Sequence, residues 1–67
     1  MTDRVLLPIA IFDGMEAVRR SGITHMLDRK LAAKVADAMG RGDAADWIRA
    51  NQVLYFEALF RGIKASE

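Results

Sequence analysis

The chain has 67 residues, enough for one small domain, and 52% of them are hydrophobic. Ten basic and nine acidic residues leave a net charge of +1, which argues against a protein whose main task is to coat nucleic acid. There is no cysteine and only one histidine, so a disulfide is excluded and no metal site is expected. The core of a single domain of this size is too small to bury so large a fraction of hydrophobic residues. We therefore expect one domain over residues 1–67 that is completed by homo-oligomerisation.

Residues 1–7 form an apolar segment that we expect to be an extended N-terminal arm. No apolar run approaches the roughly 20 residues of a membrane span. The stretch VLLPIAIF lacks the small-residue cleavage pattern of a signal peptide. The sequence therefore predicts no membrane association and a cytoplasmic location.

The first predicted helix begins at Pro8, because a proline suits the first turn, where its missing N–H is not needed. Its apolar stripe has helical spacing and consists of Ile11, Phe12, Met15 and Val18. In a second interpretation, residues 13–16 form a capping box and the helix begins five residues later. In both, Gly22 ends the helix in the left-handed conformation.

Asp28 is the predicted N-cap of a second helix, which Gly40 ends. The expected buried face of this helix consists of Leu31, Val35 and either Ala38 or Met39. Between the two helices, three apolar side chains are expected to turn inward: Ile23, Met26 and Leu27.

Asp43 is expected to cap a third, short helix that carries Trp47 and Ile48. Asn51 suits the N-cap of a fourth helix, although nothing at Asn51 forbids one continuous helix, so both arrangements stay open. The expected buried face of the fourth helix consists of Tyr55, Leu59 and Ile63, flanked by Leu54 and Ala58. The predicted fold class is all-α, a compact bundle of four short helices.

The fourth helix has a second apolar face. Tyr55 and Phe56 point about 100° apart, so one of them faces away from the core, and Phe60 shares the side of Phe56. Two apolar faces on one short helix predict a partner chain, with a second copy of this protein as the first expectation.

The basic pair Arg19 and Arg20 has two interpretations. In the last turn of a helix, cations interact favourably with the helix dipole. Alternatively, the pair joins His25, Arg29 and Lys30 across the turn in a cationic patch that receives a phosphate or an acidic surface. The candidate binding residues combine this patch with a turn threonine and two aromatic side chains for stacking: Arg19, Arg20, Thr24, His25, Arg29, Trp47 and Tyr55.

The turn itself is explained largely as a connection. Gly22 stops one helix, Asp28 starts the next, and Thr24 suits hydrogen bonds to exposed backbone groups. His25 is expected to be exposed and has no acidic partner placed by the sequence. Because no nucleotide loop, paired carboxylates or nucleophile constellation appears, we expect no enzyme, no catalytic residue and no cofactor.

A helix-turn-helix is a further interpretation, because AAKVADAMG resembles the first half of that motif. The segment that would form the recognition helix, DAADWIRA, is acidic at its N-terminal end and would repel phosphates. DNA is therefore a less favoured partner than a protein or a small anion.

The strings EAVRRSGITHMLDRK and ADWIRANQVLYFEALFRG resemble a family of very short, uncharacterised proteins of tailed phages and prophages. The resemblance covers residues 8–62, and its matching residues are Arg19, Ser21, Gly22, Thr24, Met26, Leu27, Asp28, Tyr55, Phe60 and Gly62. At His25 this chain departs from the family, which usually carries asparagine there.

The resemblance implies a phage or prophage origin and a location inside a bacterial host cell. By analogy with other small phage proteins, it implies a non-enzymatic binding protein that antagonises host defence. Such a protein would bind a defence protein or sequester an anionic nucleotide signal. The alternative is a dimeric DNA-binding phage regulator.

Overall fold

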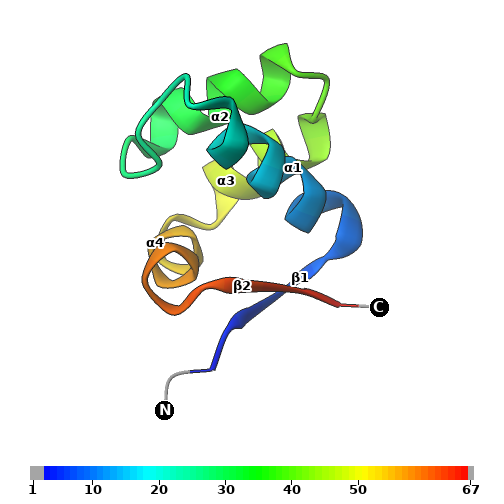
Figure 1. Ribbon diagram of the computed structural model, residues 1–67, viewed down its shortest axis with the longest axis vertical. Helices are drawn as coiled ribbons and strands as arrows, with labels where there is room; N and C mark the ends of the chain where they lie inside the picture. Colours follow the sequence, from blue (N-terminus) through cyan, green and yellow to red (C-terminus); the bar gives the residue numbers. More distant parts are fainter. Residues whose placement is uncertain (1–2, 67) are drawn as a thin grey trace.

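The computed structural model describes residues 3–66, in which four helices and two short strands follow one another (Figure 1). Strand β1 covers Val5–Pro8 and strand β2 covers Ile63–Ser66. Between them lie the helices α1 (Ile9–Ser21), α2 (Arg29–Ala38), α3 (Gly42–Ala50) and α4 (Gln52–Arg61). The prediction of a mostly helical fold with four helices is confirmed, and the two ends of the chain add a small sheet that the all-α prediction did not include.

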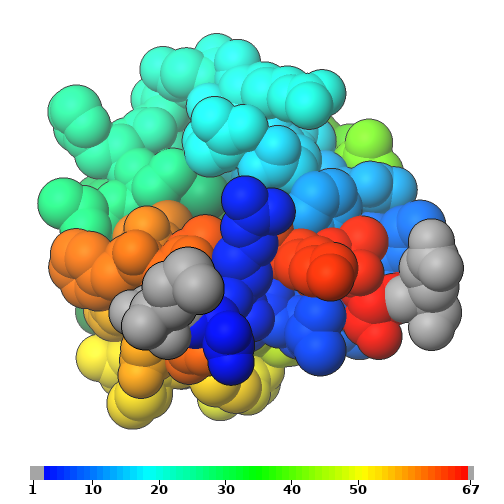
Figure 2. Space-filling model, turned by 60° about the horizontal axis from the view of Figure 1, so that its bottom comes forward, coloured from blue at the N-terminus to red at the C-terminus, as the bar shows by residue number. Residues whose placement is uncertain are grey.

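The two strands pair in parallel, with Val5 opposite Ile63 and Pro8 opposite Ser66. They cross the lower end of the molecule beside α4, and Figure 2 looks onto this face, where both strands are visible. A sheet of two strands is marginal by itself. Here it is supported by burial, because Val5 and Leu7 point into the core, where they are 8% and 1% exposed. The predicted extended arm is therefore a strand from Val5 onward; Met1 and Thr2 lie outside the described residues.

Helix α1 begins at Ile9, directly after the strand. Pro8 takes the extended conformation of an N-cap, with φ −52° and ψ 147°, so it precedes the helix and is not its first residue. The alternative start within residues 13–16 is wrong, since these residues lie inside the helix. Gly22 ends α1 with φ 66°, the predicted left-handed C-cap.

Helices α1, α2 and α3 pack against one another through small residues. Five alanines of α2 and α3 are almost fully buried: Ala32, Ala33, Ala36, Ala44 and Ala45. Helices α1 and α3 approach each other closely at Gly14, where an added Cβ would lie 2.4 Å from the Cβ of Ala44. The absence of a side chain at Gly14 thus lets the two helices meet.

The predicted face of α2 is only partly correct. Asp28 caps the helix as expected, because its Oδ1 accepts a hydrogen bond from the backbone N–H of Leu31 at 3.1 Å. Val35 is buried, but the other residues of the predicted face are exposed: Leu31, Ala38 and Met39. The alanines face inward instead, where α2 packs against α3.

Helices α3 and α4 are separate and meet at Asn51, which ends one and begins the other. The side chain of Asn51 does not cap α4; its Nδ2 donates to the carbonyl of Trp47 at 3.0 Å and so caps the end of α3. Asp43 lies in the first turn of α3, and Arg41 is the N-cap residue. No described helix is long and apolar enough to cross a membrane.

Tyr55 is the anchor of α4. Its side chain is fully buried, and its hydroxyl donates a hydrogen bond to the carbonyl of Met26 in the α1–α2 connection. Burial raises the pKa of Tyr55 to about 12, and the nearby Asp28 carboxylate acts in the same direction. Within the predicted face of α4, Ala58 is buried and Leu59 is half-buried. Leu54 is 45% exposed, and Ile63 belongs to β2.

We expect Gly14→Ala to destabilise the protein by about 1–3 kcal/mol, because the added methyl group would overlap Ala44 and force α1 away from α3. The matched control is Gly42→Ala, since a Cβ at Gly42 meets nothing within 4 Å. Urea unfolding followed by circular dichroism measures both free energies of unfolding. Equal stability of the two variants would contradict the close packing.

We expect Tyr55→Phe to cost about 1 kcal/mol through loss of the hydrogen bond to Met26. In the unfolded wild type the phenol loses its proton from about pH 10, whereas in the folded protein it keeps it to about pH 12. Wild-type stability should therefore fall, relative to the variant, as the pH rises through this window. Unfolding curves of both proteins at several alkaline pH values test this, and a constant difference would refute it.

Candidate functional site

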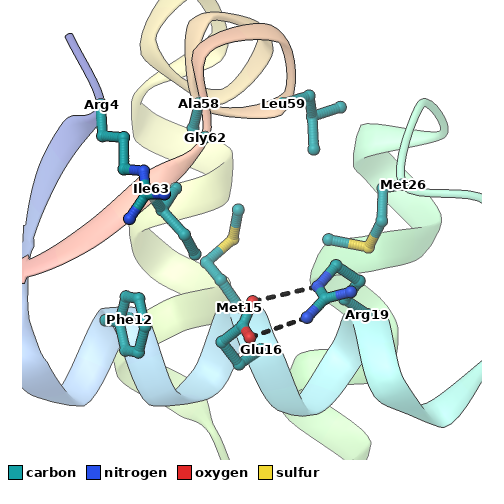
Figure 3. Close-up of a pocket in the computed structure, with 10 residues that line it drawn as sticks. All are labelled: Arg4, Phe12, Met15, Glu16, Arg19, Met26, Ala58, Leu59, Gly62 and Ile63. Atoms are coloured by element: carbon teal, nitrogen blue, oxygen red, sulfur yellow. Dashed lines mark hydrogen bonds and ion pairs between the residues drawn. The ribbon is translucent and has the colours of Figure 1, made fainter.

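A pocket of about 290 Å³ opens between α1, α4, β2 and the α1–α2 connection (Figure 3). We call it the α1–α4 pocket. Its walls are mainly apolar and consist of Phe12, Met15, Met26, Ala58, Leu59 and Ile63. Two methionines among them give an adaptable surface, because their unbranched side chains and polarizable sulfurs adjust to differently shaped groups.

Three charged residues line the same pocket: Arg4, Glu16 and Arg19. In Figure 3, Arg4 enters beside Ile63, and the Glu16–Arg19 pair borders the pocket at another edge. Within residues 3–66 no ion pair involves Arg4, so its guanidinium is available to an anion. The backbone positions this arginine, because its aliphatic chain packs at Gly62, where a Cβ would lie 3.6 Å from Cγ of Arg4.

Glu16 and Arg19 form a two-pronged ion pair on α1. Nε of Arg19 donates to Oε2 of Glu16 at 3.0 Å, and Nη2 donates to Oε1 at 2.8 Å. Residues three apart share one face of a helix, which brings the two groups together. Hydrogen bonding to Arg19 lowers the pKa of Glu16, against a smaller opposing effect of burial, and the same pair raises the pKa of Arg19. Glu16 is therefore a carboxylate near neutral pH and accepts hydrogen bonds only.

The predicted cationic patch is divided in the structure. Arg19 lines the pocket, while Arg20 is exposed and its Nη2 lies 3.8 Å from Oε1 of Glu16. Arg29 does not join them. Its Nη1 donates to the carbonyls of Ile48 at 3.0 Å and Arg49 at 3.3 Å, so it caps the C-terminal end of α3.

The α1–α2 connection is held by its own hydrogen bonds. The hydroxyl of Ser21 donates to the carbonyl of Val18 at 2.6 Å and accepts from the N–H of Ile23 at 3.2 Å. Thr24 donates to the carbonyl of His25, and His25 is exposed as expected. Of the three apolar residues expected to turn inward here, Met26 is half-buried, but Ile23 and Leu27 are 67% and 65% exposed. These contacts agree with the interpretation of the segment as a connection.

The two aromatic candidates lie elsewhere. Trp47 is half-buried in a shallow groove between α3 and the start of α1, which Asp43 and Asp46 also line. Tyr55 is fully buried and offers no stacking surface to a ligand. Among the described residues, no group of three or more histidine, aspartate and glutamate side chains is placed to hold a metal ion.

Sequence reasoning missed most of the pocket. Of the seven predicted binding residues, only Arg19 lines it. The spacing of Glu16 and Arg19 is a signal that the sequence contains. Arg4 and Ile63 carry no such signal, since only the parallel pairing of the chain ends brings them to α1.

Comparisons with protein-family models, with curated proteins and with solved structures found no match. The phage resemblance therefore depends on its motif residues alone. In the structure those residues have mainly architectural positions: Gly22 ends α1, Asp28 caps α2 and Tyr55 holds the connection.

Proposed function

We propose that the protein is a non-enzymatic binding protein that holds a small anionic ligand in the α1–α4 pocket. The observation that carries this proposal is an apolar cavity bordered by two arginines. Pockets of this composition, with a few placed polar groups, are typical of small-molecule sites. Its lining includes a carboxylate but no serine, threonine or histidine to act as a nucleophile, which favours binding over catalysis.

The size and chemistry of the pocket favour a flat apolar group attached to a phosphate or carboxylate. Its volume of about 290 Å³ lies at the lower end of ligand cavities, so it suits one base or aromatic ring rather than a whole dinucleotide. Arg4 would receive the anionic group, because a guanidinium matches phosphate and carboxylate oxygens with two parallel hydrogen bonds.

In the phage setting that the resemblance implies, such a protein would act in the cytoplasm of the bacterial host and sequester a nucleotide signal of a defence system. Within the same proposal, the protein would otherwise antagonise host defence by binding a defence protein. The alternative of a DNA-binding regulator has less support, because α3 exposes Asp43 and Asp46 in its N-terminal half.

Self-association belongs to the proposal and is supported by α4. Val53 and Phe60 are 76% and 80% exposed and lie seven residues apart, on one side of the helix. Beside them, Glu57 and Arg61 present opposite charges. Two antiparallel copies of α4 would place unlike charges across the contact while covering Phe60, so this face is self-complementary.

We expect the purified protein to bind a cyclic dinucleotide, a cyclic trinucleotide or an ADP-ribose derivative, with one base of the ligand in the pocket, in isothermal titration calorimetry. Arg4→Gln and Arg19→Gln should each weaken binding about tenfold, because each removes a charged hydrogen-bond donor from the pocket. The matched control is Arg20→Gln, which also removes a cation beside Glu16 but lies outside the pocket lining. Equal losses in all three variants, or no binding of any of these probes, would contradict the proposal.

We expect sedimentation equilibrium at micromolar concentration to give at least a dimer. Phe60→Glu should shift the protein to the monomer, because it places a charge in the apolar contact. Leu6→Glu is the control, since Leu6 is 62% exposed but lies on β1. A wild-type monomer, or a Phe60→Glu dimer of unchanged affinity, would refute the α4 contact.

A further inference from the structure

Another hollow lies over α2 and α3 and shares no residue with the α1–α4 pocket. It has a volume of about 350 Å³ and is lined by Arg29, Lys30, Ala33, Lys34 and Arg49. We call it the basic groove. Lys30 and Lys34 are one helical turn apart and therefore lie on one face of α2. The small side chain of Ala33, 1% exposed, leaves room between these cations and α3.

Arg29 is held in place before any ligand arrives. Its Nη1 is engaged by the carbonyls of Ile48 and Arg49 at the end of α3. A guanidinium has five N–H donors, so those on Nε and Nη2 are left for other acceptors. Because its direction is already set by α3, Arg29 loses little conformational freedom when an oxyanion binds.

The charges of the groove are only partly balanced. Nη2 of Arg49 lies 2.5 Å from Oδ2 of Asp37, and its Nη1 lies 3.7 Å from Oδ1 of Asp46. Within residues 3–66, no ion pair involves Arg29, Lys30 or Lys34. Three uncompensated cations around one hollow attract an anion that carries more than one charge.

The same surroundings favour a compact anion over a long one. Asp37 and Asp46 both pair with Arg49, which lines the groove, and their side chains are 47% and 84% exposed. A nucleic-acid backbone that extended past Arg49 would meet these carboxylates and be repelled. A single phosphate or pyrophosphate group is short enough to bind between the cations without reaching the two carboxylates.

We infer that the basic groove is a binding site for a phosphate or pyrophosphate group, which is bound by the side chains of Arg29, Lys30 and Lys34. The group is either a free inorganic ion or the phosphate end of a nucleotide. The site is separate from the α1–α4 pocket, and it stands even if that pocket binds no nucleotide.

The test is a titration of the ¹⁵N-labelled protein with sodium pyrophosphate at constant ionic strength, followed by NMR. We expect the largest amide shifts within residues 29–34 and at Arg49. In a Lys30→Gln/Lys34→Gln variant the dissociation constant should rise about tenfold or more, since two charged donors are lost. The control, Arg20→Gln/Lys64→Gln, removes the same charge from two exposed positions outside the groove and should bind as the wild type does.

Further titrations identify the source of the phosphate. If a nucleoside triphosphate shifts the same amides and the nucleoside without phosphates shifts none, the groove binds the phosphates of a nucleotide. If only pyrophosphate shifts these amides, the groove binds the free ion. The proposal would be overturned if pyrophosphate binding weakened equally in both double variants. It would also be overturned if amide shifts were confined to Arg4 and Arg19, or if no amide shifted. Tighter binding of a short DNA duplex than of pyrophosphate at 150 mM salt would overturn it in favour of nucleic acid.

Discussion

The parallel pairing of the two chain ends is the constraint on which the rest of the structure depends. Each strand has four residues and would not persist alone, but Val5 and Leu7 place their side chains in the core while their backbone bonds to β2. Arg61 adds a hydrogen bond from Nε to the carbonyl of Asp3 at 2.5 Å. This pairing brings Arg4 and Ile63 to α1, and without it the α1–α4 pocket would lack one of its walls.

Tyr55 supplies the complementary link between α4 and the α1–α2 connection. Its ring fills the core, and its hydroxyl satisfies a backbone carbonyl that would otherwise lose its hydrogen bond to water. Met26, whose carbonyl receives this bond, also lines the pocket with its side chain. The hydrogen bond that stabilises the fold and the lining of the candidate site therefore meet at Met26.

The distribution of charge explains how a nearly neutral chain has two separate hollows lined by basic side chains. Arg4 and Arg19 border the α1–α4 pocket, whereas Arg29 and the lysines of α2 border the basic groove. Each region also has acidic partners, since Glu16 pairs with Arg19 at the pocket, and Asp37 and Asp46 pair with Arg49 at the groove. Net charge reports only the sum of these regions, and binding depends on the local balance in each of them.

Local chemistry let the sequence determine the helix content, the left-handed end of α1 at Gly22 and the cap of α2 at Asp28, because each depends on a few neighbouring residues. The exposure of Phe60 also followed from helical periodicity. The sheet, the inward face of the α2 alanines and the division of the cationic patch were decided by tertiary structure. The sheet depends on the pairing of the two chain ends, the alanine face on the packing of α2 against α3, and the division of the patch on the carbonyls that Arg29 reaches across the fold. Such distances are set by packing between segments far apart in the chain, and no pattern within one segment contains them.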